Sequence, residues 1–319
     1  MKGYIQTISG NIKPEELGWC QCHEHIFLEK CKSAEVSSSL LMDDLKKSLA
    51  ELKDYKAAGG CSIVDAQPAY SGRMADSLTY ASIDSGIKII ASTGFHKTVF
   101  YYELCPLLDM QESKLTDFFI KEIRGSMISD ASHHFEDTAC RAGIIKTAVD
   151  SGGIYADSVY TRLYEAAASA AQTTGAPVMT HIEKGADALE VVKFFQERNV
   201  APERLILCHL DRARYDFAYH KEVAETGAYL EYDTINRLKY HDNKVEAELI
   251  IYMLECGFKD RLLMSLDTTN QRLRHYGADM GLDYILKNFA PYLESLGVSK
   301  ADIADMMIKN PAKALQFVK

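Results

Sequence analysis

The stretch PVMTHIEKGADALEVVKFFQERNVAPERLILCHLD, residues 177–211, holds the pattern that decides the fold. A short, nearly continuous apolar run at 177–183 is followed by a helical pattern at 187–199 and by a second apolar run at 204–211. Such runs are typical of parallel strands buried on both faces and joined by a helix. The stretch therefore predicts a strand–helix–strand unit.

The same alternation extends along the whole chain of 319 residues. Eight apolar runs separated by helical patterns favour a closed barrel or a doubly wound sheet. No G-x-G-x-x-G follows any of the runs, so a dinucleotide-binding sheet loses its best support. We therefore predict an α/β fold, a (β/α)₈ TIM barrel, as one domain over residues 1–319. The predicted strands cover residues 20–28, 61–66, 88–95, 142–149, 177–183, 204–211, 228–234 and 261–268.

The segments between and around these strands complete the predicted architecture. The first 18 residues are interpreted as a short extended cap, and residues 281–319 as terminal helices that close the barrel. The longest connection, 96–138, has a helical pattern near 114–127. Further helices are predicted at 43–60, 160–175, 187–199, 217–227 and 244–257, where most patterns end in Gly or Asn.

Composition excludes several classes of protein. Hydrophobic residues make up 47% and charged residues 25%, as in ordinary folded enzymes. The formal net charge of -9 argues against a nucleic-acid or anionic-membrane partner, because both need a basic surface. No apolar run approaches membrane-spanning length and the first residues lack a signal-peptide centre, so we expect a cytoplasmic protein. The eight scattered cysteines, without a C-x-x-C pair, are expected to be reduced.

Candidate metal ligands fall near the ends of the predicted strands. His23 and His25 are two residues apart on the first strand, so both side chains can face the same side. His181, His209 and Asp267 end the fifth, sixth and eighth strands, at the barrel end where such enzymes place their chemistry. Taken singly, each histidine could be structural and Asp267 could cap a helix. Their common position favours a site for Zn²⁺, Co²⁺ or Mn²⁺.

Lys146 is unusual because it lies in the apolar run AGIIKTAV, where a charged amine is unfavourable. One interpretation is that its side chain reaches past the strand end to water. The other is that its amine reacts with CO₂, since the resulting carbamate is an anion that could bridge two metal ions.

These motifs resemble the phosphotriesterase family of the amidohydrolase superfamily, and the resemblance covers essentially the whole chain. They are H-E-H at 23–25, G-I-I-K at 143–146, T-H at 180–181, C-H-L-D-R at 208–212, the strand end at Asp267 and N-P-A-K-A-L at 310–315. The resemblance implies a metal-dependent hydrolase with two divalent ions, Zn²⁺ first and Mn²⁺ or Co²⁺ as alternatives. His23, His25 and Asp267 would bind the buried ion, and His181 and His209 the exposed ion. Carboxylated Lys146 and a hydroxide would bridge them, with Asp267 as the catalytic proton acceptor.

Two loops after the seventh and eighth strands suggest the substrate. NRLKYHDNK (236–244) and TTNQRLRHYG (268–277) are basic and aromatic in an acidic chain, either as solvated loops or as a phosphate or sugar pocket. They resemble the sugar-lactone branch of the family. We therefore predict hydrolysis of a sugar lactone, specifically a phosphorylated pentono-1,4-lactone, by a homodimer. The predicted substrate-binding residues are Lys244, Arg274, Tyr276 and His96.

Other activities stay open on the same site. An organophosphate triesterase or an acyl-homoserine lactonase would use the same two ions with a different pocket. A barrel that has lost activity and binds a carbohydrate is the remaining alternative, although all six ligand positions are filled.

Overall fold

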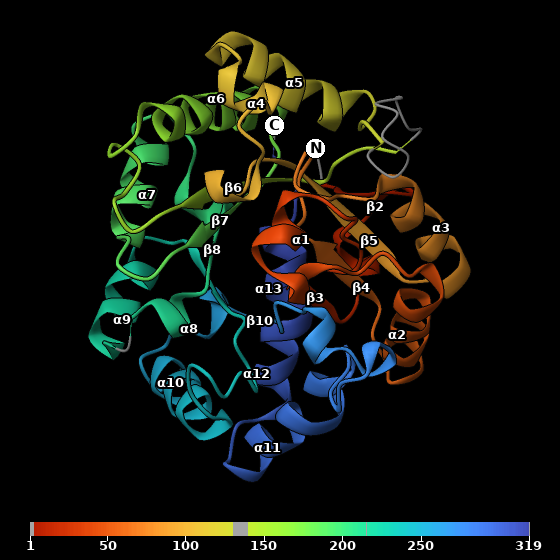
Figure 1. Ribbon diagram of the computed structural model, residues 1–319. Helices are drawn as coiled ribbons and strands as arrows, with labels where there is room; N and C mark the ends of the chain where they lie inside the picture. Colours follow the sequence, from red (N-terminus) through yellow and green to blue (C-terminus); the bar gives the residue numbers. More distant parts are fainter. Residues whose placement is uncertain (1–2, 130–139, 215, 319) are drawn as a thin grey trace.

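The computed structural model describes residues 3–129, 140–214 and 216–318. Residues 130–138 of the predicted long connection, residues 1–2 of the predicted cap and residue 319 lie outside the described part. Eight parallel strands follow one another in chain order around a nearly closed barrel, which confirms the predicted fold class (Figure 1). The strands are β3 (Cys20–Glu24), β4 (Ser62–Asp65), β5 (Lys88–Gly94), β6 (Ile144–Val149), β7 (Val178–Ile182), β8 (Leu205–Cys208), β9 (Tyr229–Tyr232) and β10 (Leu262–Met264).

Side chains complete the seam where the first and last strands of the barrel meet. The backbone N–H of His23 donates to Ser265 Oγ at 3.0 Å, and the N–H of Asp267 donates to the carbonyl of His23 at 3.1 Å. The Glu24 carboxylate accepts from the N–H groups of Leu266 and Thr268 at 2.8 and 3.2 Å. The buried Glu24 carboxylate thus accepts backbone N–H groups that would otherwise pair with a neighbouring strand.

The first predicted strand, 20–28, is wrong beyond Glu24. The register against β4 shifts between Gln21 and Glu24, and the chain then turns so that Leu28 pairs with Met42. The bulge changes which side chains face inwards. Cys20 and Cys22 belong to the barrel interior, yet His23 also points inwards, towards Lys146.

The helices form a ring around the strands (Figure 1). Aspartate N-caps start the main connecting helices, because each carboxylate accepts a hydrogen bond from the first free backbone N–H groups. These helices are α2 (Leu45–Ala57), α6 (Ser158–Thr174), α7 (Ala188–Gln196), α9 (Phe217–Glu225) and α10 (Asn243–Glu255), close to the predicted ranges. α5 (Glu112–Arg124) is the helix predicted near 114–127.

The sequence analysis gave no individual bounds for the remaining helices, of which α11, α12 and α13 lie in the predicted terminal helical segment 281–319. α3 (Ala75–Ser85) is rich in Ser, Thr and Asp, which have low helix propensity, and it ends at Gly86 with φ 67°. The others are α1 (Lys32–Val36), α4 (Pro106–Asp109), α8 (Leu210–Ala213), α11 (Ala290–Ser295), α12 (Lys300–Ala304) and α13 (Asn310–Ala314). None of the helices in the described ranges has the length and apolar character needed to cross a membrane.

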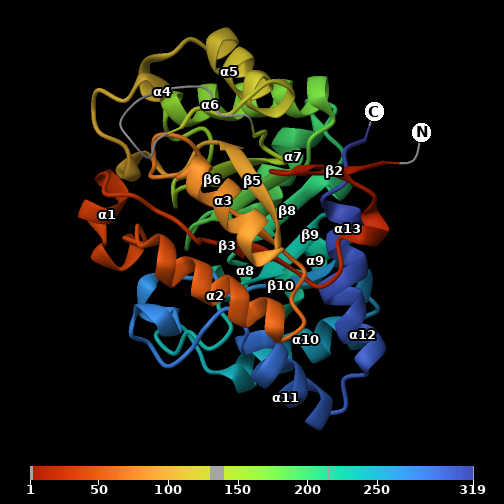
Figure 2. The same cartoon turned by 90° about the vertical axis from the view of Figure 1, so that its right-hand side faces the viewer.

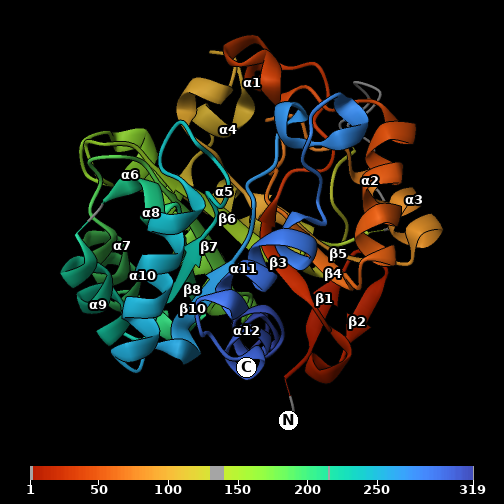
Figure 3. The same ribbon diagram turned by 90° about the horizontal axis from the view of Figure 1, so that it is seen from below.

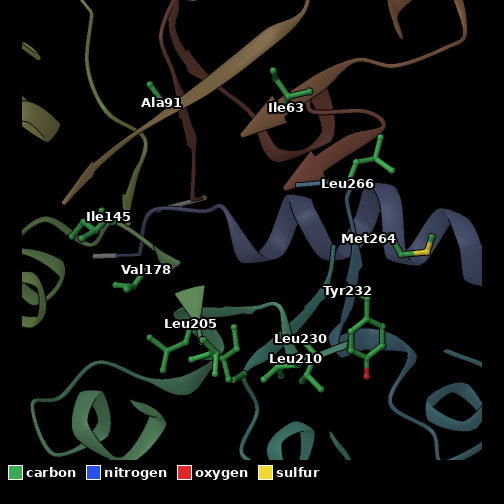
Figure 4. Close-up of a cluster of buried hydrophobic side chains, with 14 of the residues drawn as sticks. Ile63, Ala91, Ile145, Val178, Leu205, Leu210, Leu230, Tyr232, Met264 and Leu266 are labelled. Carbon is green, nitrogen blue, oxygen red and sulfur yellow. The ribbon is translucent and has the colours of Figure 1, made fainter. Parts of the chain in front are cut away.

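The core has two layers, which follow from the alternation of side chains along each strand. One set of strand residues, including Ile63, Ile145 and Leu230, packs against the surrounding helices (Figure 4). The other set fills the barrel interior, where Met179, Ile206 and Tyr229 lie side by side in register.

The two ends of the barrel differ in structure. The predicted cap is a hairpin of β1 (Ile5–Thr7) and β2 (Gly10–Ile12), whose Ile5 joins Leu17 and Leu315 in the interior cluster. Figures 2 and 3 show β2 and both termini at one end of the barrel and α1 at the other. The end with α1 is where the strands' carboxyl ends open, so it is free to hold a site.

Candidate metal centre

Four histidines meet at the open end of the barrel, and we call them the histidine cluster: His23, His25, His181 and His209. All are buried. The ring centroids of His23 lie 5.5 Å from His25 and 4.7 Å from His209, and His181 lies 4.3 Å from His209. The cluster therefore joins residues from β3, β7 and the end of β8, as the strand-end positions predicted.

Asp267 and Lys146 lie against this cluster. Asp267 Oδ1 is 3.4 Å from His25 Nε2 and 3.8 Å from His23 Nε2. The potential ligand atoms of His23, His209 and Asp267 all lie within 4.8 Å of one another. The structure thus brings together all six residues that the sequence singled out as ligands.

The backbone at two of these positions is strained. His209 has φ 67° and Asp267 has φ 48°, in the left-handed region that non-glycine residues seldom occupy. Such conformations are concentrated at functional sites, where the surrounding fold holds them.

Lys146 is fully buried on β6, with Nζ 3.3 Å from His23 Nε2 and 3.6 Å from Met179 Sδ. Neither neighbour can neutralise an ammonium group. Burial lowers the pKa of Lys146, which favours the neutral amine. Gly94 permits this crowded packing, because a Cβ there would come within 1.9 Å of the Lys146 carbonyl oxygen.

Three histidines of the cluster each have one ring nitrogen close to a carboxylate. Asp233 Oδ2 lies 3.0 Å from His23 Nδ1, and Asp233 Oδ1 lies 2.6 Å from His209 Nδ1. Glu183 Oε2 lies 3.4 Å from His181 Nε2. Carboxylate partners of this kind are typical of metal-binding histidines, because they orient the ring and fix its tautomer.

The sequence analysis missed Asp233. One signal was available. Asp233 lies near the end of the predicted strand 228–234, just as His209 and Asp267 lie near the ends of their strands.

The electrostatics favour neutral imidazoles and an ionised Asp267. Burial lowers the pKa of His23 and His209, and lowers that of His181 to about 3. Burial alone would raise the pKa of Asp267, but Arg237 and His25 hold it well below its usual range. Burial, together with the neighbouring carboxylates of Asp211 and Asp267, raises the pKa of Asp233 well above its usual range, and Arg212 opposes this shift.

The donor set fits a divalent metal. Neutral imidazole nitrogens and carboxylate oxygens are the ligands of Zn²⁺, Mn²⁺ and Co²⁺ in hydrolytic sites. His25 Nε2 faces Asp267, while its buried Nδ1 has no hydrogen-bond partner among the described residues. The ring is therefore oriented by the contacts of Nε2.

A cavity of about 200 Å³ is lined by three residues of the histidine cluster, His25, His181 and His209. One side carries three basic residues, Arg212, Arg237 and Lys239, which we call the cationic wall. Arg237 and Arg212 both contact Asp267 Oδ2, the latter at 3.3 Å. A second cavity of about 470 Å³ adjoins the first, because both are lined by Ser39, Arg237, Lys239 and Thr269.

The cavity lining also includes an ion pair and a histidine. Lys97 Nζ lies 2.6 Å from Glu183 Oε2, and the hydrogen bond from His181, together with that from Lys97, lowers the pKa of Glu183. His96 lines the cavity, as expected, with its ring 5.2 Å from that of His181.

The other three predicted substrate residues lie elsewhere. Lys244 begins α10 and is largely exposed, paired with Glu248 at 3.7 Å. Arg274 binds Asp283 at 3.0 Å and Asp54 at 3.1 Å, and Tyr276 bonds Ser48 Oγ at 2.8 Å. None of the three lines either of the two cavities described above.

The physical reason for this correction is local geometry. The loop after β10 forms short turns, Asn270–Arg272 and Arg274–Tyr276, that direct Arg274 and Tyr276 towards α2. Arg237 and Lys239, from the loop that the sequence analysis had already marked as basic, reach the cavity instead.

Comparison with known proteins agrees with the fold and identifies the family. A model of the phosphotriesterase family matches residues 3–315, so the chain belongs to the phosphotriesterase family. This places it among metal-dependent hydrolases, in a family that typically uses a binuclear metal site.

Individual relatives cover nearly the whole chain. A phospho-furanose lactonase from Mycoplasmopsis synoviae is 30% identical, covering 98% of this chain and 92% of the relative. An N-acetyltaurine hydrolase from Danio rerio is 27% identical, with 99% of each covered. The crystal structure of a lactonase from Listeria monocytogenes is similar, with a TM-score of 0.89, 29% identity and coverage of 99% and 100%.

Proposed function

We propose that this hydrolase is a lactonase that opens the ring of a phosphorylated sugar lactone, a pentono-1,4-lactone, to give the aldonate. One observation carries the proposal: a single cavity joins the histidine cluster to the cationic wall. The phospho-furanose lactonase relatives, at 30% and 28% identity, support the same substrate class.

The six buried residues provide a complete ligand set in this proposal. His23, His25 and Asp267 would hold one divalent ion, and His181 and His209 the other. Lys146, as a carbamate formed with CO₂, would supply the bridging anion, and its neutral amine is the form that reacts. When bound, two such ions, Zn²⁺ or alternatively Mn²⁺ or Co²⁺, supply an activated water and polarise the lactone carbonyl.

Asp267 acts as the proton carrier. Its low pKa keeps it ionised at neutral pH, and Oδ1 faces the histidine cluster. The carboxylate accepts a proton from the attacking water and delivers it to the ring oxygen when the C–O bond breaks. The products are one carboxylate and one hydroxyl group, so the lactone plus water gives the aldonic acid.

In this proposal the cationic wall binds the phosphate, a role that the sequence analysis gave to Lys244, Arg274 and Tyr276. Lys239 and Arg237 border both cavities, and Arg237 also contacts Asp267. Charge-assisted hydrogen bonds to phosphate are stronger than neutral ones. The rest of the cavity lining is mostly polar, with Ser39, Gln67, Lys97 and Glu183 beside the apolar Leu40 and Phe100, which favours sugar hydroxyls over an acyl chain or an aromatic leaving group.

The cationic wall also favours a second candidate. A sulfonate has the charge and tetrahedral oxygens of a phosphate, and the N-acetyltaurine hydrolases cover the full length of this chain. Hydrolysis of an N-acyl aminosulfonate is therefore the competing activity.

Substrate competition tests the proposal. We expect kcat/KM for a pentono-1,4-lactone 5-phosphate to exceed that for the unphosphorylated lactone by about 10- to 100-fold, since hydrogen bonds to charged groups contribute ~1.5–3 kcal/mol. An acyl-homoserine lactone, a chromogenic phosphotriester and N-acetyltaurine should react more slowly, and a chelator should abolish activity. Faster hydrolysis of N-acetyltaurine would overturn the proposed lactonase activity in favour of an amidase. Faster hydrolysis of the triester or the acyl-homoserine lactone would overturn the proposed substrate class, a phosphorylated sugar lactone.

Metal analysis tests the alternative of an inactive carbohydrate-binding barrel. About two ions per chain are expected after purification with zinc and bicarbonate. We also propose a homodimer, for which sedimentation should give twice the chain mass of 35.7 kDa.

A further inference from the structure

Asp233 occupies a position between two histidines from different strands. It directly follows β9 and is fully buried. One oxygen lies 3.0 Å from His23 Nδ1, and the other lies 2.6 Å from His209 Nδ1. His23 comes from β3 and His209 from the end of β8, so one carboxylate joins two separate parts of the barrel.

The opposite ring nitrogens are directed into the site. His23 Nε2 lies 3.3 Å from Lys146 Nζ and 3.8 Å from Asp267 Oδ1. The possible ligand atoms of His23, His209 and Asp267 share one space less than 4.8 Å across. Asp233 offers its two oxygens to both Nδ1 atoms and to the backbone N–H of His209, and a carboxylate that accepts all three leaves each Nε2 with a free lone pair.

We propose that Asp233 is a positioning residue that sets the same tautomer on one histidine of each metal, so that both ions depend on one carboxylate. The inference rests on the proposed function for the division of His23 and His209 between two ions. Partners of metal-binding histidines affect affinity because they fix the orientation and basicity of the ring. A partner shared by two sites couples them.

A purely structural role for Asp233 has a different basis. Its Oδ2 also accepts the backbone N–H of His209 at 3.2 Å, and His209 is strained at φ 67°. On that account Asp233 only stabilises the turn after β8. An Asp233→Asn change separates the two roles, because Asn keeps one oxygen for that N–H. Its NH₂ group can only donate, and cannot accept the Nδ1 proton of the second histidine.

The experiment compares the wild type, Asp233→Asn and a matched control, Glu231→Gln. Glu231 is also buried and lies two residues earlier, but its hydrogen bond comes from Ser265 and not from a histidine. Each protein is stripped of metal and titrated with Zn²⁺ against a competing chelator. We expect the affinity for at least one ion to fall by about 10- to 100-fold in Asp233→Asn. The control should change by less than twofold, and the melting temperature of metal-free Asp233→Asn should stay near that of wild type.

Two Zn²⁺ ions held by Asp233→Asn within twofold of the wild-type affinities would overturn the proposal. A second measurement needs no variant and no metal. In nitrogen-15 spectra of the histidines of the metal-free wild type, His23 and His209 should be protonated at Nδ1. Protonation at Nε2 on either ring would overturn the inference. Because this measurement uses only the wild type, it tests the inference even if Asp233→Asn does not fold. Failure of the wild type to bind Zn²⁺, with both rings protonated at Nδ1, would count against the proposed function and not against the tautomers set by Asp233.

Discussion

The histidine cluster and the cationic wall lie at the same end of the barrel, but they are held in different ways. The cluster residues lie within strands or within three residues of a strand end, and each is buried. In the cationic wall, Arg237 and Lys239 lie on the turns between β9 and α10, and Arg212 lies in the short helix α8. Strands place side chains by a fixed two-residue period, whereas a turn can direct the same residue to either side.

This difference suggests that the two regions have separate roles in catalysis and substrate selection. The rigid cluster would fix the chemistry, and the turns would determine which substrate reaches it. Changes in the cluster should then affect turnover on every substrate, whereas changes in the wall should affect only charged ones.

The largest effect is expected from Lys146→Ala. This variant removes the bridging anion that the proposed metal pair requires, so kcat/KM should fall by at least about 10³-fold on all substrates, equivalent to ~4 kcal/mol. Kinetics and metal analysis on the same preparation measure it. Thr147→Ala is the control, since the hydroxyl of Thr147 contacts Thr180 at 2.7 Å and lies off the site. A Lys146→Ala enzyme that keeps a tenth of the activity would show that no bridging lysine is needed.

A smaller and selective effect is expected from Lys239→Met. Loss of one charged contact should lower kcat/KM for the phosphorylated lactone by about 10-fold or more, and leave the unphosphorylated lactone within about threefold. Lys244→Met removes the same charge five residues later, outside the cavities, and serves as the control. Equal losses on both lactones, or equal effects of the two variants, would mean that the wall does not recognise phosphate.

The pH dependence of stability gives a third test, below the cluster in the barrel interior. Burial raises the pKa of Glu231 from 4.5 to about 8, so between these values the folded protein holds a proton that the unfolded chain has released. The free energy of unfolding therefore falls as pH rises through this window, by up to about 1.4 kcal/mol per pH unit from this group. Glu231→Gln should flatten that part of the profile in denaturant titrations at pH 5 to 8. The exposed Glu222→Gln should leave the slope as it is, and an unchanged slope in Glu231→Gln would contradict the assignment.

The smallest effect is expected from Arg274→Met. Arg274 and Asp54 are both about 40% exposed, and the buried Asp283 keeps Lys287 as a second partner, so the loss should be about 1 kcal/mol. Thermal unfolding should show this small loss while kcat/KM on the phosphorylated lactone stays unchanged. A tenfold rise in KM would restore Arg274 to the substrate site.

The comparison also explains how much the sequence could predict. The eight strands, the main helices and the meeting of His23, His25, Lys146, His181, His209 and Asp267 all follow from apolar periodicity, from strand-end placement and from the family motifs. Strands of a closed barrel leave few choices once their order is known.

The directions of loop side chains could not be predicted in this way. Lys239 and Lys244 are both lysines of one basic segment, and only the turn that ends at the Asp242 cap directs the first inwards and the second outwards. Asp233 was missed for a different reason. It belongs to no family motif used in the sequence analysis, and its strand-end position alone was the signal that could have found it.

The seam between β3 and β10 has a consequence for how the chain folds. The two partners that close it, His23 and Ser265, are 242 residues apart in the sequence. Joining chain segments so distant costs on the order of 5 kcal/mol from the length-dependent entropy alone. His23 and His25 lie on one side of this seam and Asp267 on the other, so an ion bound by these three residues would hold together two chain segments whose joining is entropically costly. Hydrogen exchange at the Leu266 and Thr268 amides should then respond to chelation before any other part of the barrel does.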